Sequence, residues 1–386
     1  MRDAGLEEAV KSLGLGFKDY GDIDFTTVTG HDKPSASRHY SVEDYREWLR
    51  SGTHRNFAAW VRSRNPKPTK NATEPLAVAA KRSHTQAFGA AKNDHINIVN
   101  AELMGSGLRL VHEAVREALA RQALSPFILT IGGDHSIASG SISALIAKYP
   151  SLGVIWVDAH ADANTPRSSP SGHYHGMPAA HLLGWFEHEP GEGVAEGTRL
   201  PGFEWFTPGC LTESRLAYIG LRDVDPEEGR MLRRSGVRVF TMRDVDKYGI
   251  ARVVEMAIEA TSSPTQDNPL HLSLDIDSVD PHFAPGTGTT ARGGLSYREI
   301  HYICEECAMT RRLVSMDLVE VNPGLDPPPT RAATAEDDDD EGVDSENHQH
   351  INGAMHGDHP AISAAASPTV RLALELVLSA LGKQIC

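Results

Sequence analysis

Short apolar runs alternate with amphipathic stretches along most of the chain. Apolar segments of strand length, bounded by glycine or polar residues, predict strands at 126–133, 152–160, 215–222, 237–242, 270–280 and 312–323. Helical patterns lie between and around them, at 3–14, in the second half of 96–122, and at 136–150, 225–236, 249–262, 296–310 and 367–384. Because helices separate strands that are apolar on both faces, the sequence predicts a mainly parallel sheet covered on both sides, a three-layer αβα arrangement of the α/β class.

Three polar or Pro- and Gly-rich segments, at about 33–80, 187–211 and 325–360, interrupt this alternation. We interpret them as loop insertions in a single domain that occupies residues 1–386. The last segment contains the run AEDDDDEGVDSE, whose eight acidic residues supply about half of the formal net charge of −15. The charge that remains is ordinary for this length and indicates no special class of partner.

The composition, with 40% hydrophobic and 23% charged residues, is that of a globular protein. No window of 18 uninterrupted apolar residues is present in the sequence, so we expect no membrane contact. Lys and Arg do not cluster, which argues against a nucleic-acid partner. The four cysteines are scattered and the first residues lack an apolar signal segment, so we expect a reduced, cytoplasmic protein.

Five of the predicted strands end in acidic residues or histidines, in the motifs GGDHS, DAHAD, GLRDVDPEE, DIDSVDP and DLVEVNP. In a parallel α/β sheet these strand ends lie at one edge, where ligands bind. A buried carboxylate is costly unless it is paired or bound to a metal. The concentration of acids at this edge therefore predicts a site that holds a large positive charge.

The residues at alternate positions are Asp158, His160 and Asp162 on one strand and Asp275 and Asp277 on another. If the backbone stays extended, such residues point to the same side. With His135 they supply four carboxylates and two imidazoles without a thiolate, a hard donor set that favours Mn²⁺ over Fe²⁺, Co²⁺ or Zn²⁺. Six side chains exceed what one catalytic metal needs, and they suit two metals about 3.5 Å apart, bridged by carboxylates and a water.

Seven motifs together resemble the ureohydrolases, and most closely the arginases: GGDHS, DAHADANTP, SGHYHGMP, IGLRDVDPEE, LDIDSVDP, GTGTTARGGLSYRE and DLVEVNP. The resemblance covers about residues 5–31 and the chain from about residue 95 onward, apart from the other two insertions. It implies an arginase-like fold and the hydrolysis of L-arginine to L-ornithine and urea. The implied nucleophile is a hydroxide that bridges two Mn²⁺ ions in each subunit, and the implied assembly is a homo-oligomer, a trimer or a hexamer.

The resemblance also implies a role for each candidate residue. One metal would bind His135, Asp158, Asp162 and Asp275, and the other would bind His160, Asp158, Asp275 and Asp277. The implied catalytic residues are His175 as proton shuttle, Asp162 as the group that orients the hydroxide, and Glu320 as the partner of the guanidinium. The implied substrate contacts are Asn164, Ser169 and Ser171 for the α-carboxylate, Asp225 and, through water, Glu228 for the α-amino group, and Thr289.

Two alternatives stay open. The first is agmatinase or another guanidino hydrolase; the substrate of agmatinase lacks the α-carboxylate, and Asn164 and Ser171 favour arginase over it. The second follows from the start of the chain, because arginases usually open with a β-strand and a Gly-rich loop before the helix that begins here near residue 3. We therefore expect the first family strand to be missing and a strand edge to be left unpaired, and a truncated, non-catalytic arginase-like protein is the second alternative.

Overall fold

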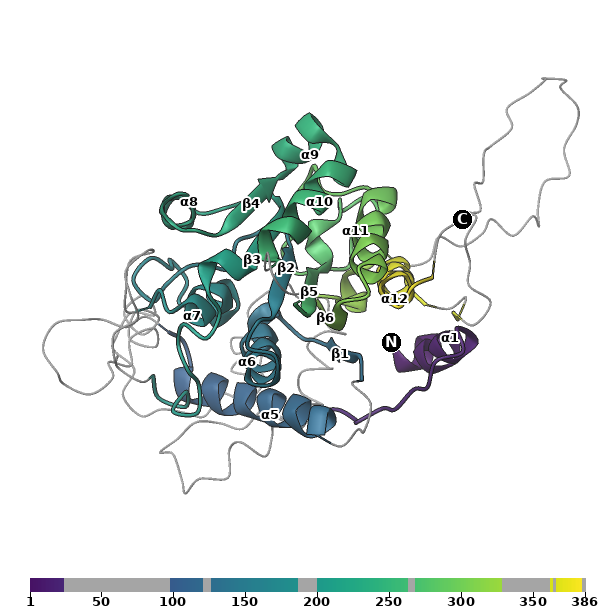
Figure 1. Ribbon diagram of the computed structural model, residues 1–386, viewed down its shortest axis with the longest axis horizontal. Helices are drawn as coiled ribbons and strands as arrows, with labels where there is room; N and C mark the ends of the chain where they lie inside the picture. The colour runs from purple at the N-terminus through teal and green to yellow at the C-terminus, as the bar shows by residue number, and fades with distance from the viewer. Residues whose placement is uncertain are drawn as a thin grey trace, which may run out of the picture.

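The computed structural model describes residues 1–23, 98–120, 126–186, 200–262, 268–327, 362–363 and 366–383 (Figure 1). The insertion predicted at about 33–80 lies outside these residues, as do most of the insertions predicted at 187–211 and 325–360. The acidic run at 335–346 lies outside them as well.

The described strands form one parallel sheet in the order β1-β6-β5-β2-β3-β4. The strands are β1 (Ile128–Ile131), β2 (Gly153–Val157), β3 (Leu216–Leu221), β4 (Arg238–Thr241), β5 (Leu270–Asp275) and β6 (Leu313–Val319). Each lies within a segment that the apolar pattern predicts. Among the described residues, β1 stands at one end of the sheet and pairs with β6 alone.

The α-helices lie on both sides of this sheet (Figure 1). They are α1 (Leu6–Ser12), α5 (Ala101–Ala120), α6 (Ala138–Lys148), α7 (Pro178–Leu183), α8 (Pro226–Arg234), α9 (Met242–Tyr248), α10 (Ile250–Thr261), α11 (Tyr297–Met309) and α12 (Pro368–Ala380). Single 3₁₀ turns are η1 (Arg2–Ala4), η3 (His135–Ile137), η4 (Tyr174–Gly176), η5 (Glu213–Arg215), η6 (Ile276–Ser278) and η7 (Pro323–Leu325). The predicted three-layer αβα architecture is confirmed.

Alternate residues of the central strands divide the core into two halves. Trp156 of β2 and Tyr218 of β3 belong to the half that contains residues of α5, α6 and α7. Their neighbours Ile155 and Ile219 belong to the half that contains residues of α10, α11 and α12. All four side chains are buried, and burying a large apolar side chain contributes about 1.5–3 kcal/mol. The strands are therefore fixed from both faces, and their ends present a rigid edge.

The sequence analysis predicts no helix directly after the SGHYHGMP motif, where the structure has α7. It begins with Pro178 at its first turn and ends at Gly184, whose φ of 79° closes the helix in the left-handed region. Residues 200–211, predicted as an extended loop, contain no helix or strand. They nevertheless bury Phe203 and Phe206 in the core, so this segment is part of the packed domain.

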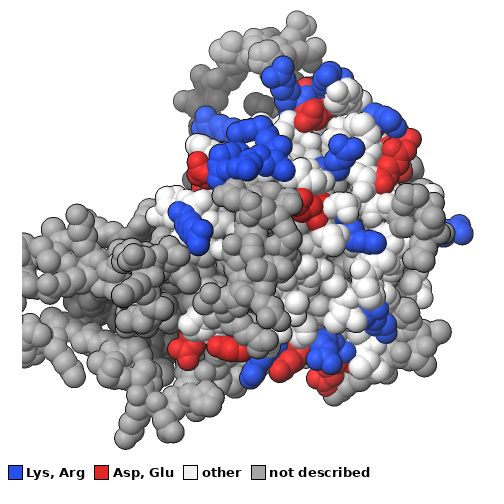
Figure 2. Space-filling view, turned by 60° about the vertical axis from the view of Figure 1, so that its left-hand side comes forward, with Lys and Arg blue, Asp and Glu red and all other residues white. Residues whose placement is uncertain are grey.

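None of the helices in the described part of the chain is both long and apolar enough to cross a membrane. Figure 2 shows basic and acidic side chains near one another along the lower part of one face, with several basic side chains together higher up. That face therefore carries charges of both signs.

Candidate metal centre and substrate site

The candidate residues follow the carboxyl ends of five strands. Because every strand pair is parallel, these ends lie at the same edge of the sheet. The positions are His135 after β1, residues 158–162 after β2, Asp225 after β3, Asp275 at the end of β5 and Glu320 after β6. The sheet order places β5 between β2 and β6, which brings together segments far apart in the sequence.

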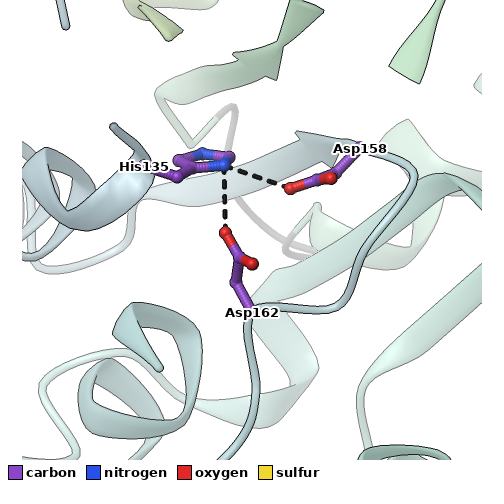
Figure 3. A group of neighbouring side chains, drawn as sticks. All are labelled: His135, Asp158 and Asp162. Atoms are coloured by element: carbon purple, nitrogen blue, oxygen red, sulfur yellow. Dashed lines mark ion pairs between the residues drawn. The ribbon is translucent and has the colours of Figure 1, made fainter. Parts of the chain in front are cut away.

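His135 lies at the centre of the first group of side chains. Its Nδ1 atom is 3.1 Å from a carboxylate oxygen of Asp158, 3.1 Å from one of Asp162 and 3.3 Å from one of Asp275. Figure 3 shows the imidazole with Asp158 and Asp162, which point toward it from the segment after β2. His135 is 1% exposed, so these charges meet away from water.

Three further contacts fix this imidazole and one of its carboxylates. Nε2 of His135 lies 2.9 Å from Oγ of Ser273 on β5. The imidazole stacks on the indole of Trp156, with 4.2 Å between the ring centroids. The indole Nε1 of Trp156 donates a hydrogen bond of 2.9 Å to Asp158. The sequence analysis missed Ser273 and Trp156; their positions at i−2 from Asp275 and from Asp158 are the signal that could have pointed to them.

A second group forms around His160. Its Nδ1 atom lies 3.0 Å from a carboxylate oxygen of Asp277 and 3.6 Å from one of Asp158. The backbone N–H of His160 donates to Asp158, and that of Asp277 donates to Asp275, at 2.7 and 2.8 Å. Asp158 therefore stands between the two imidazoles.

The expected extended backbone is wrong, although the expected convergence is present. Strand β2 ends at Val157, and Asp162 has a φ of 47°, in the left-handed region. Asp277 lies in the 3₁₀ turn η6 rather than in a strand. The chain therefore bends around the site, and the bends, not strand alternation, turn the carboxylates inward. Asp and Asn tolerate this left-handed conformation better than most other residues.

The pKa values show how strongly this cluster attracts positive charge. Burial, with the nearby Asp158, raises the pKa of Asp162 to about 8, and burial with neighbouring carboxylates raises that of Asp275 well above its ordinary value. Burial also acts to raise the pKa of Asp158, but the contacts with His135 and His160 outweigh it and hold the pKa low. For His160, the effect of burial is outweighed by the carboxylates, which raise its pKa to about 11.

The donor set fits a pair of divalent cations. Four carboxylates carry four negative charges, which two dications balance. The Nδ1 atom of His135 is buried and has no hydrogen-bond partner among the described residues, so its lone pair can serve a metal. Two sets of side chains have ligand atoms within 4.8 Å of one another: His135, Asp158 and Asp162, and Asp158, His160 and Asp277. Asp158 belongs to both sets, as a bridging ligand would.

Glu320 lies beside the first group. Its Oε1 atom accepts a hydrogen bond of 3.0 Å from the backbone N–H of His135, and its own N–H donates to the carbonyl of Gly133 at 2.9 Å. Its φ of 61° turns the chain at the end of β6. Burial raises the pKa of this carboxyl to about 7. A cation that binds here would stabilise the carboxylate form.

His175 lies in the 3₁₀ turn η4. Its side chain is 48% exposed, and its Nδ1 lies 4.0 Å from a carboxylate oxygen of Asp134. Burial lowers the pKa of this imidazole, and the charge of Asp134 opposes that shift. The ring of His173 lies 5.6 Å away. The structure thus places His175 where it meets solvent.

A hydrogen-bonded network joins three of the predicted substrate residues. The amide of Asn164 donates to Asp225 at 2.9 Å and accepts from the hydroxyl of Ser168 at 2.8 Å. Glu228 accepts from the backbone N–H groups of Ala163 and Asp225, at 2.9 and 3.0 Å, and so caps α8. Burial raises the pKa of Glu228 to about 7. This network holds the segment after β2 against the start of α8.

The other three predicted substrate residues lie on two loops. Ser169 is buried, and its hydroxyl accepts from the backbone N–H of Gly172 at 3.0 Å. Ser171 is exposed and accepts from the N–H of His173 at 3.2 Å. Thr289 is exposed on the segment between η6 and α11. A side-chain carbon built on its neighbour Gly288 would lie 3.9 Å from Glu320, so this loop borders the predicted guanidinium partner.

Comparisons with known proteins identify the family of the chain. The model of the arginase family matches residues 5–336. Relatives include the arginase of Plasmodium berghei, 40% identical over 290 residues, which are 75% of this chain and 72% of that protein. Another, from Schizosaccharomyces pombe, is 48% identical over 217 residues, 56% of this chain and 62% of that protein. The arginase of Glaciozyma antarctica is 44% identical over 220 residues, 56% of this chain, and the match spans only 60% of that relative's length.

Solved structures give the same result. The arginase of Bacillus subtilis has a TM-score of 0.56 and 32% identity, covering 75% of this chain and 83% of that one. The arginase of Entamoeba histolytica, solved in complex with L-ornithine, has a TM-score of 0.56 and 26% identity, covering 78% and 83%. With a family match over most of its length and an arginase fold, the chain belongs to the arginase family.

Proposed function

We propose that the protein hydrolyses L-arginine to L-ornithine and urea. The observation that carries this proposal is the buried cluster of four carboxylates and two imidazoles at the strand ends, with the carboxylate of Glu320 beside it. The family supports the same reaction, and the Entamoeba histolytica relative was solved with L-ornithine, which is a product of this reaction.

We assign the cluster to two Mn²⁺ ions, because its donors are carboxylate oxygens and imidazole nitrogens without a thiolate. His135, Asp158, Asp162 and Asp275 would hold one ion, and His160, Asp158, Asp275 and Asp277 would hold the other. When bound, a pair of such ions makes a shared water acidic enough to act as a nucleophile near neutral pH. Asp162 reaches the centre of this cluster and can orient that nucleophile through a hydrogen bond.

Glu320 and His175 serve the organic part of the reaction. The planar guanidinium of arginine and a carboxylate form two parallel hydrogen bonds, so Glu320 fixes the carbon that is attacked. His175 is partly exposed and adjacent to Asp134. It can therefore take up a proton from solvent and deliver it to the leaving amine of ornithine.

The network around Asn164 supports arginine over agmatine. Asn164 and Ser171 would contact the α-carboxylate, with Ser169 as a further hydroxyl. Asp225, Glu228 through water, and Thr289 would complete the substrate site. A polar site that is built around a substrate group rejects analogues without that group by large factors.

We also propose a domain organisation, a location and an assembly for the protein. Residues 1–386 form a single catalytic domain with insertions, which works in the cytoplasm as a homo-oligomer, a trimer or a hexamer. Scattered cysteines support the location, and family membership supports the assembly.

One assay tests the reaction and its specificity together. Protein purified with Mn²⁺ is incubated with L-arginine or with agmatine, and released urea is measured. We expect urea from arginine, with kcat/KM at least about 10³-fold higher than for agmatine. Urea from agmatine alone would show a different guanidino hydrolase, and the absence of urea from both, with metal bound, would show a non-catalytic protein.

A pair of variants separates metal binding from proton transfer. Asp158→Ala should lose bound metal, because Asp158 contacts both imidazoles of the cluster. His175→Ala should keep two metals per chain and lose about 10²-fold or more in kcat. Equal metal loss in both variants would contradict the assigned roles.

A further inference from the structure

Arg222 lies directly after β3, and its guanidinium is surrounded by backbone carbonyls. Nη2 donates to the carbonyls of Asp277 and Ala291, each at 2.7 Å. Nη1 donates to the carbonyl of Ser278 at 3.0 Å, and Nε donates to that of Arg292 at 3.2 Å. The side chain thus joins the segment that carries Asp277 to the loop that follows it.

The backbone of the same residue holds the other metal-ligand segment. The N–H groups of Arg222 and Asp223 both donate to the carbonyl of Ala159, at 2.9 and 3.0 Å. Ala159 lies between Asp158 and His160, and its own N–H donates to the carboxylate of Asp277 at 3.3 Å. Residue 222 therefore contacts both segments that supply the second group of ligands.

The neighbouring loop is shaped to admit this guanidinium. A side-chain carbon on Gly294 would lie 2.6 Å from Nη2 of Arg222, so only glycine leaves room for it. The carboxylate of Asp280 accepts from the N–H groups of Gly293 and Gly294, at 2.8 and 3.2 Å. These contacts fix the loop in the position that the guanidinium binds.

The chemistry of arginine suits this place better than that of lysine. A guanidinium offers five N–H donors in one plane, whereas an ammonium offers three. Burial lowers the pKa of Arg222, and the carboxylates of Asp277 and Asp158 act against that shift. Arginine stays protonated in proteins, so a permanent positive charge lies close to the cluster. Because the guanidinium donates to backbone carbonyls, the carboxylate oxygens stay available to a metal.

We propose that Arg222 is a positioning residue. It sets the spacing between the Asp158–His160 segment and Asp277, and so holds the ligands of the second metal site, around His160, in place. It also anchors the loop that precedes α11, on which Thr289 lies. The position of His135 in the first metal site depends less on Arg222, because Asp162 and Ser273 contact that imidazole from other segments. The inference rests on the proposed two-metal centre.

Equilibrium dialysis against Mn²⁺ tests this on the full chain, with metal per folded chain as the readout. Wild-type protein should bind two ions. Arg222→Met should bind one ion as wild type does and the other about 10–100-fold more weakly, the effect typical of losing a group that orients a ligand. Arg222→Lys should lie between the two, since an ammonium can donate to only some of the carbonyls.

Arg252→Met is the matched control, because Arg252 is exposed on α10 and pairs with Glu255 there. It should bind metal as wild type does. Two ions bound with unchanged affinity by Arg222→Met, or equal weakening of both ions, would overturn the inference. If Arg222→Met does not fold, Arg222→Lys decides by the same criterion. A wild-type protein that binds no metal would instead refute the two-metal centre itself.

Discussion

Two groups of histidines and aspartates lie within the sheet or at the ends of its strands. One is the cluster at the strand ends, and the other is the pair of His271 on β5 and Asp317 on β6. In the pair, Nε2 of His271 lies 3.2 Å from a carboxylate oxygen of Asp317. Nδ1 of His271 lies 2.8 Å from the hydroxyl of Ser315, and Ser141 donates to Asp317 at 2.5 Å.

The two groups differ above all in charge balance. The pair has one carboxylate for one imidazole; burial acts to raise the pKa of Asp317, but His271 and Ser141 outweigh it and hold it low. The strand-end cluster has two carboxylates for each imidazole, and there the pKa of Asp275 is raised well above its ordinary value. Buried ionisable groups alone therefore do not mark a metal site. A metal site is indicated by an excess of buried carboxylates over the imidazoles that could balance their charge.

The largest expected effect comes from removing the shared ligand of the cluster. Asp158→Asn keeps the shape of the side chain but removes its charge, so we expect both metals to be lost and kcat/KM to fall by at least about 10³-fold. Metal per chain and urea release are the measurements. Retention of two metals with high affinity would show that Asp158 is not a bridging ligand.

The corresponding change in the balanced pair should affect stability instead. Asp317→Asn leaves His271 without its charged partner in the core, and we expect a loss of about 3 kcal/mol in the free energy of unfolding. Two metals should remain bound, because Asp317 is not in the cluster. Urea denaturation and metal analysis of the same sample measure both quantities. Metal loss as large as that of Asp158→Asn would remove the distinction between the two groups.

The charge excess also predicts a pH dependence for the metal-free protein. The pKa of Asp162 is about 8 in the folded state, so this carboxyl keeps its proton where the unfolded chain has released it. Its contribution to stability is therefore present below about pH 4 and is lost as the pH rises toward 8, by up to about 1.4 kcal/mol per pH unit.

Thermal unfolding of metal-free protein at several pH values between about 5 and 8 measures this slope. Asp162→Asn should make it less steep, since the amide does not titrate while the other carboxyls with raised pKa values, such as Asp275 and Glu320, still do. Mn²⁺ should reverse it, because the ions replace protons and bind better as the carboxyls ionise. An equal slope in wild type and Asp162→Asn would contradict the assigned shift.

The smallest effect is expected at the exposed rim, away from both buried groups. Ser171→Ala removes a hydroxyl that makes one exposed hydrogen bond to the backbone, so the free energy of unfolding should change by less than about 0.5 kcal/mol. If Ser171 contacts the α-carboxylate, KM for arginine should rise about tenfold. KM for agmatine should not change, and a parallel rise for both substrates would exclude that contact.

Much of the fold follows from the sequence because apolar strands and amphipathic helices have distinct periods. The order of the strands in the sheet does not follow from the sequence pattern, because β5 pairs with β2 and β1 pairs with β6 across long stretches of the chain. The cluster was predictable because its acids sit at strand ends, where burial without metal is costly. The bend at Asp162 was not, because an aspartate at this position is equally compatible with extended backbone.

The role of Arg222 is the part of the site that the sequence pattern predicts least. It stands in the GLRDVDPEE motif, where the acidic residues and not the arginine indicate a metal or substrate site. Its own partners are carbonyl oxygens of 277, 278, 291 and 292, and backbone carbonyls carry no sequence signal. Arginine is also most often a surface residue, so nothing in the pattern marks this one as partly buried.

The position of β6 has a consequence for how the protein matures. The ligands from the segments after β1 and β2 leave the ribosome well before Asp275 and Asp277 are synthesised, and β6, the last strand to be made, must then enter between β5 and the much earlier β1. Until that insertion is complete, β1 and the His135 that follows it are not held beside the segments that carry the other ligands, and neighbouring carboxylates repel. We therefore expect metal binding to be a late step of folding, one that stabilises the completed sheet and does not nucleate it.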